Sequence, residues 1–404
     1  MNVDLVALLI ISAVAVIAPL VAELPLRRRL PAVVIEIALG IAIGPHVLGL
    51  TDAKGALGFL GTLGLAFLFF LSGLEIDFQR IRGRPLHLAT VGWFCSLAMS
   101  AAIALLLHYV GFLRATMLVT VAICTTSLGI LVPILRDFNN LDTVFGSMVL
   151  AAGAVGEFGP IILISVLLTG DSGHAVQVIL LATFTLVAVG AAVIAVNFQP
   201  PALIRFLGRG MHATSQLPVR ISLLLMIGFV YLAQRFGLDL ILGSFAAGML
   251  ISLASKGHPG LPLRDKLDGI GFGFLVPIFF ITSGIHFDVY ALVATSQNLL
   301  RLPVFLALFL VVRGTPALLY RRDLPRHELL PFALLSATGL PLIVAIAEIG
   351  VSTGRMRTDN AAALVGAGMI SVFLFPLLAL LLRNRRARRT SEEMPVYRWT
   401  PTTL

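Results

Sequence analysis

Hydrophobic positions along the chain form long runs rather than the alternating or one-faced patterns of a soluble domain. Apolar stretches of about 17–25 residues recur almost end to end, and this is the length that an α-helix needs to cross a bilayer. The pattern predicts 13 membrane-spanning helices, over residues 3–22, 31–49, 57–74, 86–110, 115–135, 144–168, 175–197, 217–235, 238–254, 267–286, 297–320, 328–350 and 359–382.

The composition supports this interpretation. Only 12% of the residues are charged, where a soluble domain has about a quarter, and the mean hydropathy is +1.00. We therefore predict an all-α polytopic membrane protein with one transmembrane domain over residues 1–385. Residues 386–404 are predicted to be a basic, disordered cytoplasmic tail. The first run lacks a basic start and precedes Arg27–Arg29, which favours a span over a cleaved signal peptide.

The net charge of +9 is explained by the placement of the basic residues between the spans. If the loop holding Arg27–Arg29 is cytoplasmic, 22 of the 29 Lys and Arg residues fall on that side and six on the other, with Arg313 inside a span. This asymmetry predicts a cytoplasmic (inner) membrane protein with its N-terminus outside and its C-terminus inside. It gives no indication of nucleic-acid binding.

Two predicted spans contain turn-forming residues in the middle of an apolar run. The fifth holds "CTTSLGILVPIL" (124–135) and the twelfth holds "LLSATGLPLIVA" (334–345). Gly129 and Pro133 in the first, and Gly339 and Pro341 in the second, are predicted helix breaks, because Pro removes an amide donor and Gly permits unusual dihedrals. Unwound backbone at membrane depth is tolerated only inside protein or beside a wet cavity.

The two interrupted spans lie seven apart, an odd offset. This spacing predicts two inverted six-helix repeats, at about 1–168 and 217–382, joined by a linker helix at about 175–197. Paired discontinuous helices in inverted repeats mark the substrate site of a transporter near the bilayer midplane. The alternative is that these are ordinary kinks of membrane helices.

Glu157, in "GAVGEFGPIIL", lies near the centre of the sixth predicted span. An ionised carboxylate there is costly and should face a cavity or a partner. Because burial favours the neutral form of a carboxyl group, such a residue can hold a proton or a bare monovalent cation near neutral pH. Gly153, Gly156 and Gly159 keep the helix surface small enough for a broken helix to approach. The alternative is a protonated glutamate that bonds a neighbouring helix.

Arg313 is the other charge near a span centre, and an arginine keeps its proton in a protein. It either pairs with Glu157 in one state or permanently offsets the negative ends of the broken half-helices.

The remaining acidic residues near the spans are secondary candidates. Glu36 either reaches the cytoplasmic face or acts as a second carboxylate. Glu75 and Asp77 border the inner surface beside two arginines, which favours interfacial ion pairs, and Glu348 nears the outer end of span twelve. Cys95 and Cys124 lie within spans and are expected to be small packing residues.

Five segments resemble the monovalent cation/proton antiporter superfamily, in the branch of sodium/proton exchangers and glutathione-gated potassium efflux antiporters. They are "LPAVVIEIALGIAIGPHVLGL", "LGLAFLFFLSGLEIDFQRIR", "CTTSLGILVPILRD", "LVPIFFITSGIHFD" and "LLSATGLPLIVAIAE".

The resemblance implies a homodimer in which a core domain carries the ion past a dimerisation domain in an elevator-type motion, with the broken spans crossing beside span six. It places the family's ion-binding aspartate on Glu157 and its basic residue on Arg313. The chain departs from the family by having Glu rather than Asp, and by having Gly156 where Asp, Asn or Gln is usual.

We therefore predict a secondary antiporter, not an enzyme, that exchanges H⁺ for Na⁺ or K⁺ with electroneutral 1:1 stoichiometry. Glu157 is the shared proton and cation site. Oxygens that could complete it belong to Thr125, Thr126, Ser127, Ser336 and Thr338. The alternatives are a carrier of another solute, such as an organic anion or an ionophore-bound cation, and a non-transporting sensory protein. No cofactor is expected beyond the transported ions, and membrane lipid is the expected environment.

Overall fold

The computed structural model describes residues 5–23, 31–113, 115–137, 140–167, 174–197, 214–254 and 263–393. These segments contain helices and turns and no strand, which confirms the predicted all-α class. Each predicted span coincides with one helix or with consecutive helices. Within the described residues, nine helical segments are long and apolar enough to cross a membrane, and four shorter apolar helices cover the other ranges. The number of 13 crossings therefore stays a prediction.

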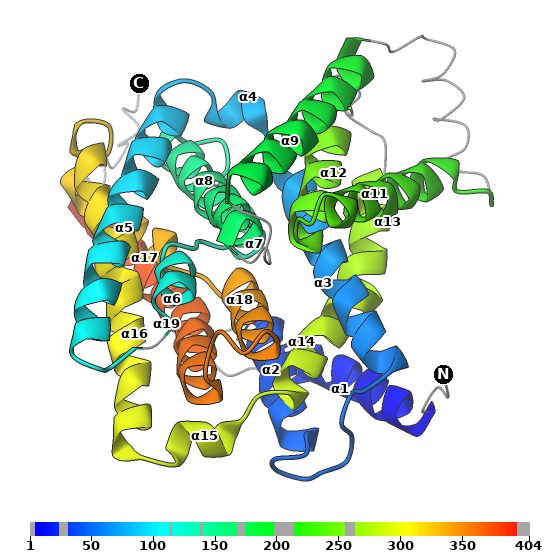
Figure 1. The fold of residues 1–404 in the computed structure, drawn as a ribbon. Helices are drawn as coiled ribbons and strands as arrows, with labels where there is room; N and C mark the ends of the chain where they lie inside the picture. Colours follow the sequence, from blue (N-terminus) through cyan, green and yellow to red (C-terminus); the bar gives the residue numbers. More distant parts are fainter. Residues whose placement is uncertain are drawn as a thin grey trace, which may run out of the picture.

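The helices form two groups that lie side by side (Figure 1). The first group consists of α1 (Leu5–Glu23), α2 (Ala32–Ile43), α3 (Ala56–Glu75), α11 (Leu217–Arg235), α12 (Leu240–Ala254), α13 (Leu263–Ile270), η1 (Gly271–Leu275) and α14 (Val276–Ile285). The second consists of α5 (Arg84–Tyr109), α6 (Thr116–Ile123), α7 (Leu128–Asp137), α8 (Val144–Leu167), α16 (Ser296–Gly314), η2 (Thr315–Arg322), α17 (Arg326–Ser336), α18 (Pro341–Ser352) and α19 (Thr358–Glu393). The α9 helix (His174–Asn197) falls between the two repeats in sequence.

Glycines let the helices of the first group cross at backbone contact. A Cβ atom on Gly73 of α3 or Gly248 of α12 would collide with the backbone of the other helix, and the same holds for Gly40 of α2 and Gly284 of α14. Small residues at such crossings are typical of membrane helix pairs. The seven-span offset relates α2 to α12 and α3 to α14. The α3–α12 and α2–α14 crossings are therefore equivalent, which supports the inverted repeats.

The second group contains the two broken spans. The α6 and α7 helices are separated by residues 124–127, and α17 and α18 by residues 337–340. The predicted break at Gly339 and Pro341 is confirmed, because Pro341 is the first residue of α18. The predicted break at Gly129 and Pro133 is wrong, since both residues lie within α7.

The tenth predicted span is also irregular. It consists of α13, a π-helical turn at η1 and then α14, whereas the sequence predicts one continuous helix. Two short helices, α4 (Phe78–Ile81) after α3 and α15 (Val289–Val293) after α14, lie at opposite ends of the molecule (Figure 1).

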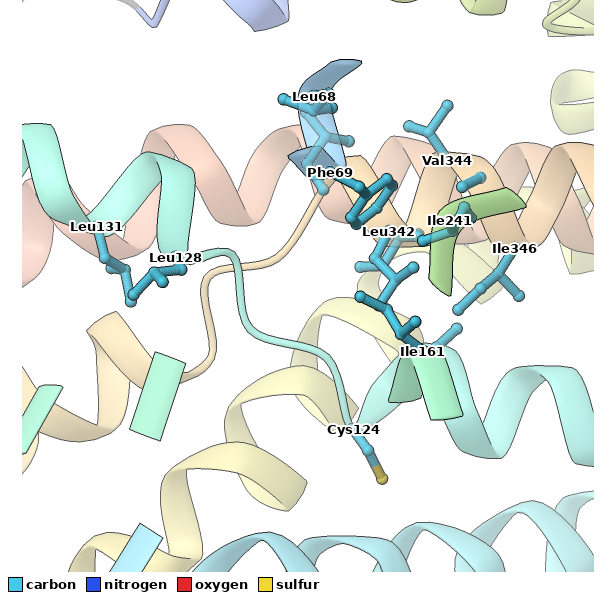
Figure 2. Packing of buried hydrophobic residues seen from close by; sticks show 14 of the residues in the cluster. Leu68, Phe69, Cys124, Leu128, Leu131, Ile161, Ile241, Leu342, Val344 and Ile346 are labelled. Carbon is cyan, nitrogen blue, oxygen red and sulfur yellow. The ribbon is translucent and has the colours of Figure 1, made fainter. Parts of the chain in front are cut away.

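Buried apolar side chains from both groups meet around the broken helices. Figure 2 shows Phe69 of α3, Ile161 of α8 and Leu342 of α18 on one side of the extended segment that joins Cys124 to Leu128, and residues 124–127 are buried. Cys124 is buried and Cys95 is exposed, and both thiols are free. The irregular backbone is therefore enclosed by protein.

Candidate ion-binding site

Direct hydrogen bonds join the two breaks to each other and to α8. The backbone N–H of Ser127 donates to the carbonyl of Thr338 at 2.9 Å, and that of Thr126 donates to the carbonyl of Gly156 at 2.9 Å. The Thr126 hydroxyl donates to the carbonyl of Ser336 at 2.5 Å. These bonds satisfy backbone groups that helix ends leave open, which is required at membrane depth.

The Glu157 carboxyl group lies at this crossing and is 2% exposed. Its Oε2 accepts a hydrogen bond from the backbone N–H of Leu128 at 3.0 Å, and the Ser72 hydroxyl of α3 also bonds the carboxyl group. Leu128 begins α7, and the N-terminal end of a helix carries partial positive charge that attracts an anion. The carboxyl group thus has one backbone donor from a broken helix and one hydroxyl from the other helix group.

Glycines on α8 leave the space in which the crossing fits. A Cβ atom on Gly156 would lie 2.5 Å from Nη2 of Arg313 and 2.8 Å from Cβ and Oγ1 of Thr126. On Gly153 it would lie 3.1 Å from the Leu128 side chain. Any larger residue at position 156 therefore requires Arg313 and Thr126 to move.

Arg313 of α16 is 4% exposed and bonds the crossing rather than the acid. Its Nε donates to Thr126 Oγ1 at 2.8 Å and its Nη2 to the Ala152 carbonyl at 3.1 Å. A weaker contact of 3.4 Å reaches Ser96 Oγ. Among the described residues its hydrogen bonds do not include Glu157. This geometry favours a fixed positive charge beside the C-terminal ends of α6 and α17.

The predicted hydroxyl ligands divide into two classes. Thr125 donates to the Ala122 carbonyl at 2.9 Å and Thr338 to the Leu334 carbonyl at 3.1 Å, so both hydroxyls turn back onto the helices that precede them. The hydroxyls of Ser127 and Ser336 are buried and have no hydrogen-bond partner within the described part of the chain. These two oxygens are free to contact an ion.

Glu75 lies close to the site from the side of α3. Its Oε1 accepts from Nη2 of Arg264 at 2.9 Å, whereas Oε2 is buried, unpartnered in the described segments and next to Gly129. Glu75 therefore forms the expected ion pair, but with Arg264 of α13 instead of Arg80 or Arg82. Asp77 does pair with Arg80, at 3.0 Å.

A cavity of about 390 Å³ opens beside Glu75. Its charged lining comes from Glu75, Asp77, Arg80, Arg136, Asp142 and Arg264. All of these residues fall in loops or helix ends that the sequence places on the cytoplasmic side. We call this the inner cavity.

The other two acidic candidates lie away from the crossing. Glu348 lines a second cavity of about 370 Å³, the outer cavity, where its Oε1 is 4.0 Å from Nδ1 of His286. Glu36 is 6% exposed and lines a third cavity of about 520 Å³ between α1, α2 and η1. Nothing in the described segments bonds its carboxyl group.

Ser72 and Arg264 contact acidic candidates and were not among the residues predicted from the sequence. Ser72 could have been predicted from the sequence, since it stands three residues before Glu75 on the same helix and therefore on the same face. Arg264 could not, because it is 189 residues away from Glu75. Within the described residues no group of three or more His, Cys, Asp or Glu could hold a metal ion, so the site offers one carboxylate and neutral oxygens.

Comparisons with known proteins find a match to the family described as "Sodium/hydrogen exchanger, transmembrane", over residues 12–380. The chain is 29% identical to the "Putative Na(+)/H(+) antiporter YjbQ" of Bacillus subtilis, over 94% of this chain and 63% of that protein. It is 25% identical to the "Na(+)/H(+)-K(+) antiporter GerN" of Bacillus cereus, over 88% of this chain and 91% of that protein.

Two further matches concern length and fold. "Cation/H(+) antiporter 18" of Arabidopsis thaliana is 26% identical, and the match covers 96% of this chain but 50% of that protein. The chain thus spans between half and two thirds of the length of two of these relatives. The structure of the sodium proton antiporter MjNhaP1 from Methanocaldococcus jannaschii at pH 8 superposes with a TM-score of 0.61 at 17% identity, covering 95% of this chain and 97% of that one. This similarity confirms the fold.

Proposed function

Because this chain belongs to the sodium/hydrogen exchanger family, we propose that it is a secondary antiporter that exchanges protons for Na⁺ or K⁺. The observation that carries the proposal is the Glu157 carboxyl group, buried in the membrane domain at the crossing of two broken helices. The names of the relatives include both Na⁺ and K⁺, so both ions belong in the test.

Glu157 binds either the proton or the cation, and never both. An ionised carboxylate that has lost its ion is costly at membrane depth, which makes the loaded forms the ones that cross. The Leu128 N–H and the Ser72 hydroxyl hold the carboxyl group in place in either state. Competition for one group therefore couples the two fluxes.

Neutral oxygens complete the cation site in this proposal. The Ser127 and Ser336 hydroxyls are buried and unpartnered within the described residues, so they can turn toward a cation without breaking a bond. The Thr126 hydroxyl joins the two breaks instead, and the Thr125 and Thr338 hydroxyls bond the helices that precede them. Hard cations prefer such carboxylate, hydroxyl and carbonyl oxygens.

Arg313 supplies a constant positive charge and does not take part in the exchange. With one exchangeable carboxylate and a fixed arginine, each cycle moves one proton against one cation, so transport is electroneutral. A membrane current that accompanies transport would contradict this stoichiometry.

The two helix groups are the bodies that move in an elevator-type cycle. The inner cavity lies between α3 and α13 of the first group and α7 and α8 of the second, and the outer cavity lies between α14 and α18. Glu75 lines the inner cavity together with the more exposed Asp77 and Asp142, and its Oε2 lies next to Gly129 of α7. We further propose a homodimer in the inner membrane with the N-terminus outside.

The experiment is proton efflux from acid-loaded proteoliposomes on addition of Na⁺, K⁺ or Li⁺, for the wild type, Glu157→Gln and Glu36→Gln. The matched control removes an equally buried carboxyl group that has no partner within the described part of the chain. We expect efflux in the wild type and in Glu36→Gln, and none above protein-free liposomes in Glu157→Gln.

Each other outcome has a definite meaning. Efflux in Glu157→Gln at the wild-type rate would refute the assigned site. If the folded wild type showed no proton efflux with any of the three cations, cation exchange would be refuted. That result would favour the same scaffold carrying another solute.

A further inference from the structure

The third cavity lies in the first helix group, away from the crossing of the broken helices. Its volume is about 520 Å³, and its walls come from α1, α2, η1 and the start of α14. The α1, α2 and α14 helices pack against one another in the lower part of Figure 1. Sites for small organic ligands have volumes of about 300–1,000 Å³, so this cavity is large enough for one. We call it the α1–α2 cavity.

Glu36 is the buried polar group of the α1–α2 cavity. Its side chain lines the cavity, only 6% of the residue is exposed, and its carboxyl group has no hydrogen-bond or ionic partner in the described segments. Glu23, the last residue of α1, is exposed and also lines the cavity. Among the described residues no basic side chain is part of this lining, so the cavity is acidic.

The remaining lining decides which kind of cation fits. It consists of Ala, Val, Leu, Pro, Gly and Phe residues, and none of these described residues offers a hydroxyl or amide oxygen from its side chain. A bare metal cation needs several oxygen ligands and would lack them here. An organic ammonium ion needs fewer acceptors, and its own apolar part can fill the rest of the cavity.

The acidic and apolar parts of the cavity lie at different depths. Glu23 ends α1 and Glu36 is near the start of α2, so both acids are on the side that the sequence predicts to be cytoplasmic. Ala15, which also lines the cavity, precedes Glu23 by two helical turns and therefore lies about 12 Å deeper. A ligand with its charge near the membrane surface and its apolar part in the hydrocarbon matches this arrangement.

The cavity opens toward lipid. Val16 and Leu20 of α1 and Phe272 of η1 line it and are exposed on the surface of membrane spans. Exposed apolar side chains on such spans face the hydrocarbon of the bilayer. A lipophilic ligand can therefore enter from the membrane.

The π-helical turn at η1 leaves space beside the cavity. A Cβ atom on Gly273 of this turn would meet no heavy atom within 4 Å, and Gly273 lines the cavity. A larger side chain at this position can therefore enter the cavity without a clash. Single π-helical turns are frequent at functional sites.

We propose that the α1–α2 cavity binds a lipophilic organic ammonium ion from the inner half of the bilayer. The ammonium group donates to the Glu36 carboxylate, and the apolar part lies between α1 and η1. Such a ligand brings the positive charge and the N–H donors that a buried carboxylate requires. Glu23 attracts the cation to the entrance. The site is separate from Glu157 and does not depend on the proposed exchange.

The test is photolabelling of the full chain in proteoliposomes at neutral pH. The probe is a primary alkylamine that carries a benzophenone, and the matched probe has a hydroxyl group in place of the amine. Labelling that an excess of the unlabelled alkylamine displaces is measured against probe concentration and located by mass spectrometry of peptides. We expect labelling of α1 or η1 by the amine, with half-saturation at a concentration at least about tenfold lower than for the alcohol.

Two variants test the parts of the site separately. Glu36→Gln should raise the half-saturating amine concentration by about tenfold to a hundredfold and leave the alcohol unchanged. Gly273→Leu should lower labelling by both probes, because its side chain occupies the cavity. The controls are Glu348→Gln, at an acid of the outer cavity, and Gly228→Leu, at an equally open glycine of α11. Both should label as the wild type.

Three results would overturn the proposal. Equal half-saturation by the amine and the alcohol would show that the cavity takes apolar molecules without recognising charge. Unchanged amine affinity in Glu36→Gln would exclude its carboxyl group. Loss of amine labelling in a folded Glu157→Gln would place the amine at the proposed ion site instead. Because labelling needs no transport, a protein that exchanges no ions but shows the expected labelling would refute the antiport alone.

Discussion

Glu157 and Glu36 are two glutamates in the same membrane domain, 2% and 6% exposed, in very different surroundings. Glu157 receives a backbone N–H from a broken helix and a hydroxyl from α3. Glu36 lines a cavity whose other lining residues are apolar except for Glu23, and its carboxyl group has no bond within the described residues. Burial alone therefore does not distinguish the proposed ion site from Glu36. The donors around a carboxyl group, and the helix ends that supply them, make the difference.

The largest effect should come from removing the positive charge of Arg313, which bonds the crossing beside Glu157. Arg313→Gln takes charge-assisted hydrogen bonds from Thr126 and Ala152, each worth about 1.5–3 kcal/mol. We expect a strong loss of thermal stability and of cation-driven proton flux. Arg235→Gln, at an exposed arginine that bonds Tyr231, is the control and should keep both. A fully active Arg313→Gln would show that the crossing does not need this charge.

The next effect tests whether the crossing tolerates any volume on α8. Gly156→Ala places a methyl group against Arg313 and Thr126, and overpacking of this kind costs about 1–3 kcal/mol. We expect lower stability in thermal unfolding and a large loss of transport. Gly228→Ala on α11, where a Cβ atom meets nothing within 4 Å, should behave as the wild type. Equal behaviour of the two variants would contradict the close approach.

A smaller effect should follow from moving the carboxyl group without removing it. Glu157→Asp shortens the side chain by one methylene and weakens the bond from the Leu128 N–H, which is worth about 1.5 kcal/mol or more. We expect the apparent cation affinity to fall by about tenfold while exchange continues. Affinity is measured as the cation concentration for half-maximal dequenching. Unchanged affinity would mean that the Leu128 amide does not hold the carboxyl group.

Removing one hydroxyl should have a smaller effect again. Ser72→Ala deletes the donor that α3 provides to Glu157, at a cost of about 0.5–1.5 kcal/mol. We expect an affinity loss of about threefold to tenfold. Ser222→Ala, which removes a buried hydroxyl bonded to the Pro218 carbonyl on α11, is the control and should show none. A larger loss in the control would break the assignment of Ser72 to the site.

The smallest effect should come from replacing Glu36. Glu36→Gln replaces a carboxyl group that has no partner in the described part of the chain. Transport should therefore keep its cation affinity and its pH profile within about twofold. A lost or shifted pH profile would make Glu36 a second proton site and remove the contrast with Glu157.

The sequence predicts much of this arrangement because burying a polar group in a membrane is costly. A charged or turn-forming residue within a long apolar run can therefore be recognised from the sequence alone. A carboxylate at position 157, an arginine at 313 and a proline at 341 stand out against apolar neighbours. The match to the sodium/hydrogen exchanger family confirms the family that the five quoted segments indicated.

Other features depend on contacts between distant segments. The first break lies at residues 124–127 and not at Gly129, because amides there bond to Gly156 and Thr338. No local pattern contains that information. The choice between two roles for Arg313 required its partner Thr126 to be known, and the pairing of Glu75 with Arg264 required the fold itself.

The hydrogen bonds of the crossing also determine what can move. Thr126 and Ser127 join three chain segments through peptide groups, and side-chain substitutions leave those bonds available. We expect these amides to exchange with deuterium as slowly as a helix interior, although they lie in irregular backbone. In the proposed exchange, the bound ion would then cross the membrane with these hydrogen bonds intact. The site would therefore select among cations in the same way on both faces of the membrane.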